Sequence, residues 1–255
     1  MKKYLAILAI FAVAAVLVGC GDSDASLKKV LAKGELVIGL DDSYPPMGFR
    51  DENGNIVGFD IDLANEVCAR LGIKLKAQPI SWETKEQELN SGNVDCIWNG
   101  MSVDSSRAAA MNLSDPYLKN SMFFVVRDSS LANYDSLKDK VIATQKGSTS
   151  QTFLAASEVG KSAREVVYFD DNQMALAGLE NGSVDVVYLD GVFAKYWILK
   201  NHKEFVILED VGSDEKLAIG FRKGDQALRN AVNEIVNAMK KDGRFVSISM
   251  KWFGK

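Results

Sequence analysis

The chain has 255 residues, of which 47% are apolar, 25% charged and 9% aromatic, so it can bury one large core or two smaller ones. Its 4 Pro, 20 Gly and 3 Cys exclude a collagen-like, low-complexity or disulfide-stapled protein. A net charge of −4 provides no basic surface, so no nucleic-acid partner is expected. His202 is the only histidine and no ligand cluster accompanies it, so we expect no metal, cofactor or catalytic triad.

The N-terminus has the pattern of an export signal. Lys2 and Lys3 precede an apolar run over residues 4–18, which is shorter than the ~20 residues of a membrane-spanning helix. The sequence Leu17-Val18-Gly19-Cys20 resembles a bacterial lipobox, which implies cleavage before Cys20 and a diacylglycerol on its sulfur. An uncleaved anchor helix is the alternative. We predict a signal peptide over residues 1–19 and a lipid-anchored tether over residues 20–33.

Removal of the signal peptide leaves a net charge of −6, because Lys2 and Lys3 are its only charged residues. No later segment is long and apolar enough to span a membrane. We therefore expect an extracytoplasmic protein held by lipidated Cys20 on the periplasmic side or outer face of the plasma membrane.

Two cysteines remain in the exported part of the chain. Cys68 falls on the apolar face of a predicted helix and Cys96 in a predicted strand. Both are expected to be buried thiols that pack as small apolar side chains, with a disulfide left open as the alternative.

Strands and helices alternate along the rest of the chain. Residues 35–40 form a β-branched run that predicts a buried strand, and Tyr44-Pro45-Pro46 predicts a loop. Residues 53–55 (Asn-Gly-Asn) predict a hairpin turn, and Asp60 is expected to cap a helix that Gly72 ends. This order of elements indicates an α/β fold with parallel strands.

One helix–turn–strand pattern occurs twice. Residues 89–97 (LNSGNVDCI) return as residues 179–187 (LENGSVDVV), and the strand over 141–144 resembles that over 37–40. We infer two lobes of similar topology, each of roughly a hundred residues. Chance similarity of two common units is the alternative.

Polar residues stand where the predicted strands end. In open α/β sheets a ligand binds beyond the carboxyl ends of the strands, where loops and helix N-termini converge. Asp41, Asn99 and Gly100 leave the first lobe there, and Gln145 and Asp190 leave the second. If the lobes face each other, these residues line one cleft.

The charges at these positions favour a zwitterionic ligand. Arg107 near a helix start suits a bidentate carboxylate, and Ser102 adds a hydroxyl. The loop over residues 146–150 offers N–H groups from the other lobe, and Asp190 offers a negative charge to an ammonium. The alternatives are a surface ion pair of Arg107 with Asp104 and a helix cap for Asp190.

The chain resembles the extracytoplasmic solute-binding proteins (family 3) of polar amino acid ABC transporters, a group that includes histidine-, lysine/arginine/ornithine- and glutamine-binding proteins. The resemblance covers nearly everything after the signal and depends on the order and spacing of several motifs. These are Asp41-x-x-Tyr44-x-Pro46, residues 58–64 (GFDIDLA), Ser102-x-x-x-x-Arg107, Asp115-Pro116-Tyr117, Gly147-Ser148-Thr149 and Leu189-Asp190.

The resemblance implies a periplasmic-binding-protein type II fold, in which two α/β lobes are joined by two hinge strands and close over one amino acid. We expect lobe 1 to comprise residues 34–123 and 219–255, and lobe 2 residues 124–218. The protein is expected to be a monomer that delivers its ligand to a membrane permease, whose separate ATPase supplies the energy.

The resemblance also assigns roles to individual residues. Arg107, Ser102 and Thr149 would bind the α-carboxylate, and the Gly100 carbonyl, Ser102 and Asp190 the α-ammonium. Tyr44 and Trp82 would sandwich the ligand side chain, with core packing as the alternative for both rings. Asp41 would meet the far end of the side chain.

A buried carboxylate at position 41 favours a basic amino acid, then glutamine. Asn99 and Gln145 could also bridge to a longer ligand such as cystine, which we rank third. Two other functions stay open. One is a secreted cyclohexadienyl-dehydratase-like enzyme, for which Asp41, Glu83 and Glu86 are the candidate general acids. The other is a ligand-sensing module.

Overall fold

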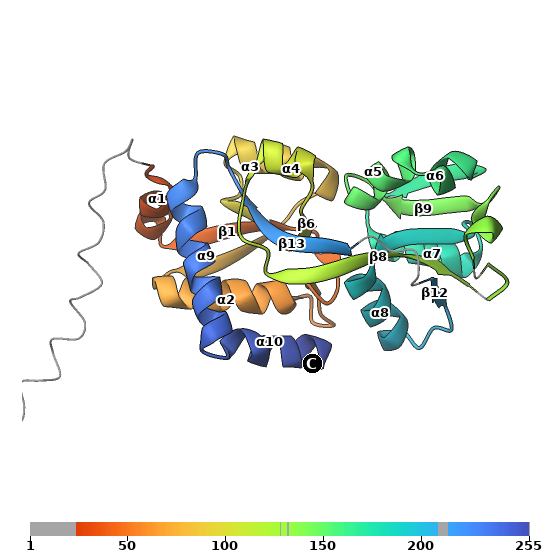
Figure 1. Ribbon diagram of the computed structural model, residues 1–255. Coiled ribbons are helices and arrows are strands. Elements are labelled where there is room, and N and C mark those ends of the chain that lie inside the picture. Colours follow the sequence, from red (N-terminus) through yellow and green to blue (C-terminus); the bar gives the residue numbers. More distant parts are fainter. Residues whose placement is uncertain (1–23, 128, 132, 209–213, 255) are drawn as a thin grey trace, which may run out of the picture.

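The computed structural model describes residues 24–127, 129–131, 133–208 and 214–254 (Figure 1). The predicted signal peptide and Cys20 lie outside these residues. Within the described ranges, no helix has the length and apolar character needed to cross a membrane.

The first lobe is built on a parallel sheet in the order β5 (Lys74–Pro79), β1 (Glu35–Leu40), β6 (Cys96–Ser102). The predicted strand over 35–40 and the predicted helix after it are confirmed. The helices of this lobe are α1 (Ser26–Lys33), α2 (Phe59–Leu71), η1 (Trp82–Thr84), α3 (Lys85–Ser91), α4 (Ser105–Ala110), α9 (Gln226–Lys241) and α10 (Arg244–Phe253). Its short strands are β2 (Ser43–Tyr44), β3 (Gly48–Arg50), β4 (Ile56–Val57) and β7 (Asn112–Leu113).

The second lobe repeats this design with the parallel order β10 (Glu165–Phe169), β9 (Val141–Gln145), β11 (Val186–Asp190). Strand β12 (Val206–Leu208) lies antiparallel to β8 (Leu118–Val126). The helices here are η2 (Ser129–Leu131), η3 (Tyr134–Leu137), α5 (Thr149–Ala156), α6 (Glu158–Ser162), α7 (Asn172–Asn181) and α8 (Gly191–Lys200).

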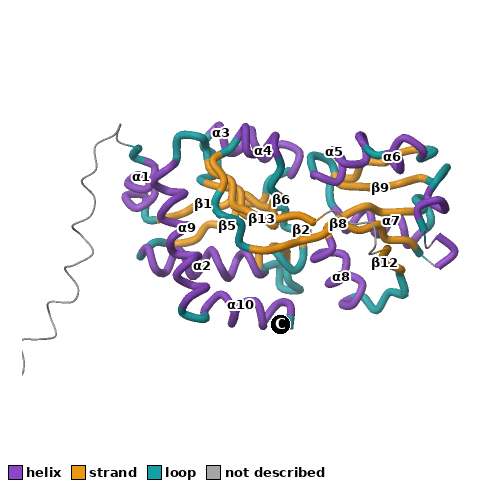
Figure 2. The backbone as a smooth tube through the Cα atoms, in the orientation of Figure 1, coloured by secondary structure: helices purple, strands orange, loops and turns teal. Residues whose placement is uncertain are grey.

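Two strands pass between the lobes, β8 and β13 (Asp214–Phe221), as Figures 1 and 2 show. Residues 118–121 of β8 pair with residues 214–217 of β13, and residues 122–126 of β8 pair with β11 of the second lobe. The C-terminal half of β13 pairs with β6 of the first lobe. The expected two-lobed architecture is therefore present, and the lobe boundaries expected at 123/124 and 218/219 fall inside these strands.

The repeated sequence pattern corresponds to a repeated structure. Helix α3 ends at Gly92 and leads into β6, and α7 ends at Gly182 and leads into β11. Both glycines have a positive φ, 83° and 82°, so each helix ends with the same left-handed residue. The inference of two lobes of similar topology is confirmed.

The segment expected as a tether through residue 33 is folded over its second half. Residues Ser26–Lys33 form α1, which packs against α9 and buries Val30. The Ser26 hydroxyl accepts a hydrogen bond from the Leu228 N–H at 3.0 Å, at the start of α9. The tether expected over residues 20–33 is therefore wrong for residues 26–33, because Val30 gives this short, charged helix an apolar side that packs on the lobe.

The two cysteines are buried and free, as predicted. Cys68 lies in α2 and Cys96 in β6. Burial raises the pKa of Cys68 to about 11, so its thiol stays protonated at neutral pH.

Candidate functional site

A pocket lies between the lobes, at the carboxyl ends of β1, β6, β9 and β11. The structure brings all ten predicted ligand-binding residues to its walls. The lining residues are Asp41, Tyr44, Trp82, Asn99, Gly100, Ser102, Arg107, Gln145, Ser148, Thr149 and Asp190. Ser148 was not among the candidates, although it belongs to the loop that the sequence singled out.

Arg107 brings a buried guanidinium to this pocket from α4. Its Nη1 donates to the Ser102 carbonyl at 2.8 Å, and its Nη2 donates across the cleft to the Gly147 carbonyl at 3.3 Å. The Nε lies 3.4 Å from an Asp104 carboxylate oxygen. The ion pair considered as an alternative therefore exists, but it is not a surface pair, because the Arg107 side chain is only 5% exposed.

A second lobe 1 cation, Lys85, was not predicted. Its side chain is buried, and Nζ donates to the Gly147 carbonyl at 2.8 Å and to the Trp82 carbonyl at 3.1 Å. Burial, followed by the nearby charge of Arg107, lowers the pKa of Lys85 to about 8. Lys85 and Arg107 together bind one carbonyl oxygen of the opposite lobe.

Gly147 allows this close approach of the lobes. Its φ of 67° disfavours any residue with a Cβ, and a Cβ there would lie 2.8 Å from the Glu83 Cα. The contact is made by backbone on both sides, so it cannot be relieved by a side-chain rotation. The described structure is thus closed around the pocket.

Asp190 brings a carboxylate to the pocket from the second lobe. It occupies the N-cap position of α8, but its side chain makes no capping hydrogen bond, which argues against the helix-cap alternative. The carboxylate instead accepts a hydrogen bond from Asn120 Nδ2 at 2.6 Å. Burial, followed by the charge of Glu215, raises the pKa of Asp190 to about 7.

Asp41 links the lobes at another part of the pocket. One carboxylate oxygen accepts from Gln145 Nε2 at 2.7 Å, and the other accepts from the Ser43 N–H at 2.9 Å. Asn99 Oδ1 accepts from the Asp41 N–H at 3.1 Å. Burial raises the pKa of Asp41 to about 6, with smaller contributions from the charges of Asp171 and Asp42.

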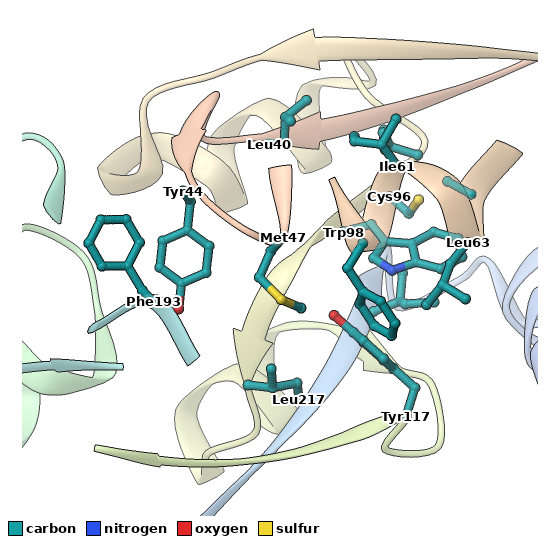
Figure 3. Close-up of a cluster of buried hydrophobic side chains, with 14 of the residues drawn as sticks. Leu40, Tyr44, Met47, Ile61, Leu63, Cys96, Trp98, Tyr117, Phe193 and Leu217 are labelled. Carbon is teal, nitrogen blue, oxygen red and sulfur yellow. The ribbon is translucent and has the colours of Figure 1, made fainter. Parts of the chain in front are cut away.

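The two aromatic candidates, Tyr44 and Trp82, line the pocket and also pack against other side chains. The Tyr44 ring stacks on Phe193 of the other lobe, and Figure 3 shows the two rings side by side. Their centroids are 5.3 Å apart. Arg107 Cζ lies 6.0 Å from the centroid of the Trp82 ring. A Cβ on Gly100 (φ 55°) would lie 2.9 Å from the Tyr44 ring, so glycine is needed there for the ring to fit.

Asp60 has a different role from the expected helix cap. The N-cap of α2 is Gly58, and Asp60 is buried beneath the pocket. One of its oxygens accepts from the Gly100 N–H at 2.7 Å and from the Tyr117 hydroxyl at 3.0 Å. Burial raises the pKa of Asp60 to about 7. Asp60 therefore positions the Gly100 backbone, which lines the pocket.

Asn120 and Glu215 are functional candidates that the sequence did not reveal. They lie opposite each other on β8 and β13, and they contact Asp190 and Ser102 respectively. What places them at the site is the pairing of two strands about a hundred residues apart in sequence, and a single sequence does not show this pairing.

The arrangement suits a small zwitterion. A guanidinium from one lobe and a carboxylate from the other border the same pocket, and both side chains are buried. Buried charges are costly unless they are paired, so a ligand carrying both an anionic and a cationic group complements the site.

The chain is similar to known proteins that bind amino acids. Residues 36–255 match the family of bacterial extracellular solute-binding proteins, family 3. The L-cystine-binding protein TcyJ of Escherichia coli (strain K12) is 26% identical over 99% of this chain and 95% of its own length. An ABC uptake transporter substrate binding protein from Streptococcus pneumoniae with bound histidine is 33% identical, with a TM-score of 0.88 over 92% of this chain and 98% of that one.

A third relative is the ancestral amino acid-binding protein AncCDT-1, a precursor of cyclohexadienyl dehydratase. It is 31% identical, with a TM-score of 0.82, and the match covers 89% of this chain and 99% of that chain. These likenesses confirm the type II periplasmic-binding-protein fold. By the extent of the match over residues 36–255, the chain belongs to the bacterial extracellular solute-binding proteins, family 3.

Proposed function

We propose that this protein is an extracytoplasmic receptor that binds a polar amino acid by closing its two lobes and delivers it to an ABC permease. The observation that carries the proposal is that buried Arg107 and Asp190 reach the same pocket from opposite lobes. A ligand with both charges contacts the two lobes only when they are closed, so its binding favours closure.

The residues divide the ligand between them. Arg107 and Thr149 bind the α-carboxylate, with Arg107 as the bidentate donor. The Gly100 carbonyl, Ser102 and Asp190 accept the three protons of the α-ammonium. The family resemblance supports these assignments, although it places Ser102 at the α-carboxylate as well, and all five residues lie on the pocket walls.

Tyr44 and Trp82 flank the ligand side chain, and Asp41 lies at its far end with Asn99 and Gln145. A buried carboxylate whose pKa is raised by burial attracts a cation, whose charge lowers that pKa again, so a basic amino acid is favoured first. Glutamine follows, because its amide can donate to Asp41. Cystine is third, since Asn99 and Gln145 could bridge to its second polar end. The relatives bind histidine and cystine by their printed names, which supports this range of side chains.

A ligand screen by thermal shift tests the proposal. The purified protein is heated with each of the twenty amino acids, ornithine and cystine. A ligand present at 100 times its dissociation constant stabilises the folded state by ~2.7 kcal/mol. We expect stabilisation by arginine, lysine, histidine or glutamine. No stabilisation by any of the compounds at millimolar concentration contradicts the proposed function.

Lipid anchoring through Cys20 completes the proposal, because an anchored receptor stays close to its membrane permease. Labelling of cells with radioactive palmitate should mark the wild-type protein but not Cys20→Ala. Uptake of the identified amino acid should fall when the protein is deleted. A label that persists in Cys20→Ala contradicts the anchoring.

An enzymatic function is the second candidate, because AncCDT-1 is a precursor of a dehydratase and Asp41 has a raised pKa. Of the three acids considered from the sequence, Asp41 lines the pocket, while Glu83 and Glu86 are not among its lining residues. We propose that the protein is not an enzyme. Incubation with prephenate or arogenate should give no product above background, and turnover that is lost in Asp41→Asn would replace the receptor proposal.

A further inference from the structure

Glu215 lies directly behind the amine end of the pocket. It sits on β13, opposite Asn120 of β8, where the two strands pass between the lobes. The same Glu215 oxygen, Oε2, accepts two hydrogen bonds. One comes from the Ser102 hydroxyl at 2.6 Å and the other from Asn120 Nδ2 at 3.4 Å. Glu215 itself lines the groove between α8 and α10, so the ligand pocket is on the far side of Ser102.

The contact with Glu215 fixes the polarity of Ser102. A serine hydroxyl has one proton to donate and two lone pairs that can accept. Because that proton is directed to Glu215, Ser102 offers the pocket only its lone pairs. A hydroxyl in this state accepts from an ammonium and repels a carboxylate oxygen, so Ser102 belongs to the amine end alone.

Glu215 also adds a second negative charge at this end. Asn120 Nδ2, which is neutral, donates to both Asp190 and Glu215. Arg107, whose charge lowers the pKa of Asp190, makes its ion pair with Asp104 instead. The two carboxylates are thus joined through an amide, and a cation that enters the pocket is attracted by both.

We propose that Glu215 is a specificity-determining residue that makes the pocket select a protonated α-amine over an α-hydroxyl group. This inference rests on the proposed function. An ammonium can donate to the Gly100 carbonyl, Ser102 and Asp190 together, whereas a hydroxyl donates to one of them and carries no charge. Glu215 acts through Ser102 and through its field, without touching the ligand.

The test uses Glu215→Gln in the full-length mature protein, with Asp214→Asn as the matched control. Asp214 is the preceding residue of the same strand, and its Oδ1 accepts from the exposed Ser121 hydroxyl at 3.4 Å. The probes are L-arginine, L-histidine, L-glutamine and L-cystine, each compared by calorimetry with the analogue in which a hydroxyl replaces the α-amine. Glu215→Asp, which keeps the charge, serves as the second variant.

We expect Glu215→Gln to bind the amino acid about tenfold or more weakly, while its hydroxy analogue is affected much less. The ratio of the two affinities should recover in Glu215→Asp and stay at the wild-type value in Asp214→Asn. A purely structural role would weaken both ligands equally and leave the ratio unchanged.

A pH profile gives an independent readout. The groups that face Asp190 are Glu215, Arg107, Tyr44 and Asn120, and of these Glu215 raises the pKa of Asp190 by its negative charge. Affinity should fall as the pH drops through the pKa of Asp190, and in Glu215→Gln that fall should begin at a lower pH.

An unchanged affinity ratio together with an unchanged pH profile in Glu215→Gln overturns the inference and leaves the proposed function standing. If the wild-type protein binds none of the amino acids of the thermal-shift screen, both the proposed function and the inference are wrong. The two failures are therefore distinguishable.

Discussion

The two lobes share a helix–turn–strand scaffold and differ in the residues at the carboxyl ends of its strands. In each, an aspartate after the helix-ending glycine ties the turn to the neighbouring strand. Asp95 accepts from the Val37 N–H at 2.8 Å, and Asp185 accepts from the Val141 N–H at 2.9 Å. The N–H of each aspartate donates back to the carbonyl of the same valine. The repeated Val-Asp pair is thus a device that sets the register of β6 on β1 and of β11 on β9.

Beyond these turns the lobes diverge. In the first lobe β6 continues to Ser102 and leads through a short loop to Arg107 in α4. In the second lobe β11 ends at Asp190 and α8 begins at once. The same scaffold therefore presents a cation in one lobe and an anion in the other. The repeated segments therefore determine the fold, while the residues at the ends of the strands and just beyond them determine what the cleft binds.

The largest expected effect comes from Arg107, the cation that the first lobe brings to the pocket. Arg107→Ala removes the donor for the α-carboxylate and should weaken amino acid binding by more than a hundredfold, or ~3 kcal/mol. Calorimetry measures the loss. Arg50→Ala is the control, because Arg50 pairs with Asp42 at 2.6 Å with a side chain that is 52% exposed. Wild-type affinity in Arg107→Ala would show that Arg107 does not bind the α-carboxylate.

The paired aspartates of the scaffold should contribute unequally. Asp95 has a 12% exposed side chain and also accepts from Lys33 at 2.7 Å, whereas Asp185 is 26% exposed and lies 3.6 Å from Arg164. We expect Asp95→Asn to lower the free energy of unfolding by about 2–3 kcal/mol and Asp185→Asn by about 1 kcal/mol. Urea denaturation of both variants compares them directly. An equal loss in both would mean that burial does not distinguish the two turns.

The close approach of the lobes at Gly147 can be tested by adding one methyl group. Gly147→Ala places a Cβ against the Glu83 backbone and should weaken amino acid binding by about thirtyfold, or ~2 kcal/mol, by opposing closure. Gly54→Ala is the matched control, since Gly54 also has a positive φ (81°) but has no atom within 4 Å of the added Cβ. Equal affinities in the two variants would show that closure does not need this contact.

A pH effect of smaller size follows from the buried carboxylates. Burial raises the pKa of Asp60 and Asp190 to about 7 and of Asp41 to about 6, above the ordinary value of 3.8. The folded state therefore holds protons that the unfolded state releases, and the stability they contribute is lost as pH rises through 6–7. Without amino acid, the free energy of unfolding should be roughly 1.5 kcal/mol higher at pH 6.5 than at pH 8.

Saturating amino acid should reduce this pH effect, because the ligand ammonium stabilises the charged form of Asp190. Denaturation at the two pH values, with and without amino acid, checks both statements. If the free energy of unfolding rises with pH in this window, burial does not disfavour the charged forms of these three carboxyl groups.

The sequence predicted the parts of the site that come from local pattern. Asp41, Gly100, Gln145 and Asp190 were found because each lies at or near the carboxyl end of a recognisable strand, and parallel strands bring these ends together. The pocket residues Trp82 and Thr149 came from the family resemblance. Their ligand-binding roles stay predictions.

Other features depend on contacts between distant segments. Lys85 is the first residue of α3 and looks like a solvated charge in sequence, but closure buries it against Gly147 of the other lobe. Asp60 has the position of a helix cap, and only the tertiary structure directs it to Gly100. Glu215 likewise depends on how β13 crosses between the lobes. In each case one sequence does not show which groups meet.

Small-angle X-ray scattering of the protein, with and without an amino acid that stabilises it, tests lobe closure most directly. We predict that the radius of gyration falls when the amino acid is added at saturating concentration, and that Gly147→Ala shows a smaller fall. Scattering curves that coincide with and without the bound amino acid would contradict closure as the binding mechanism.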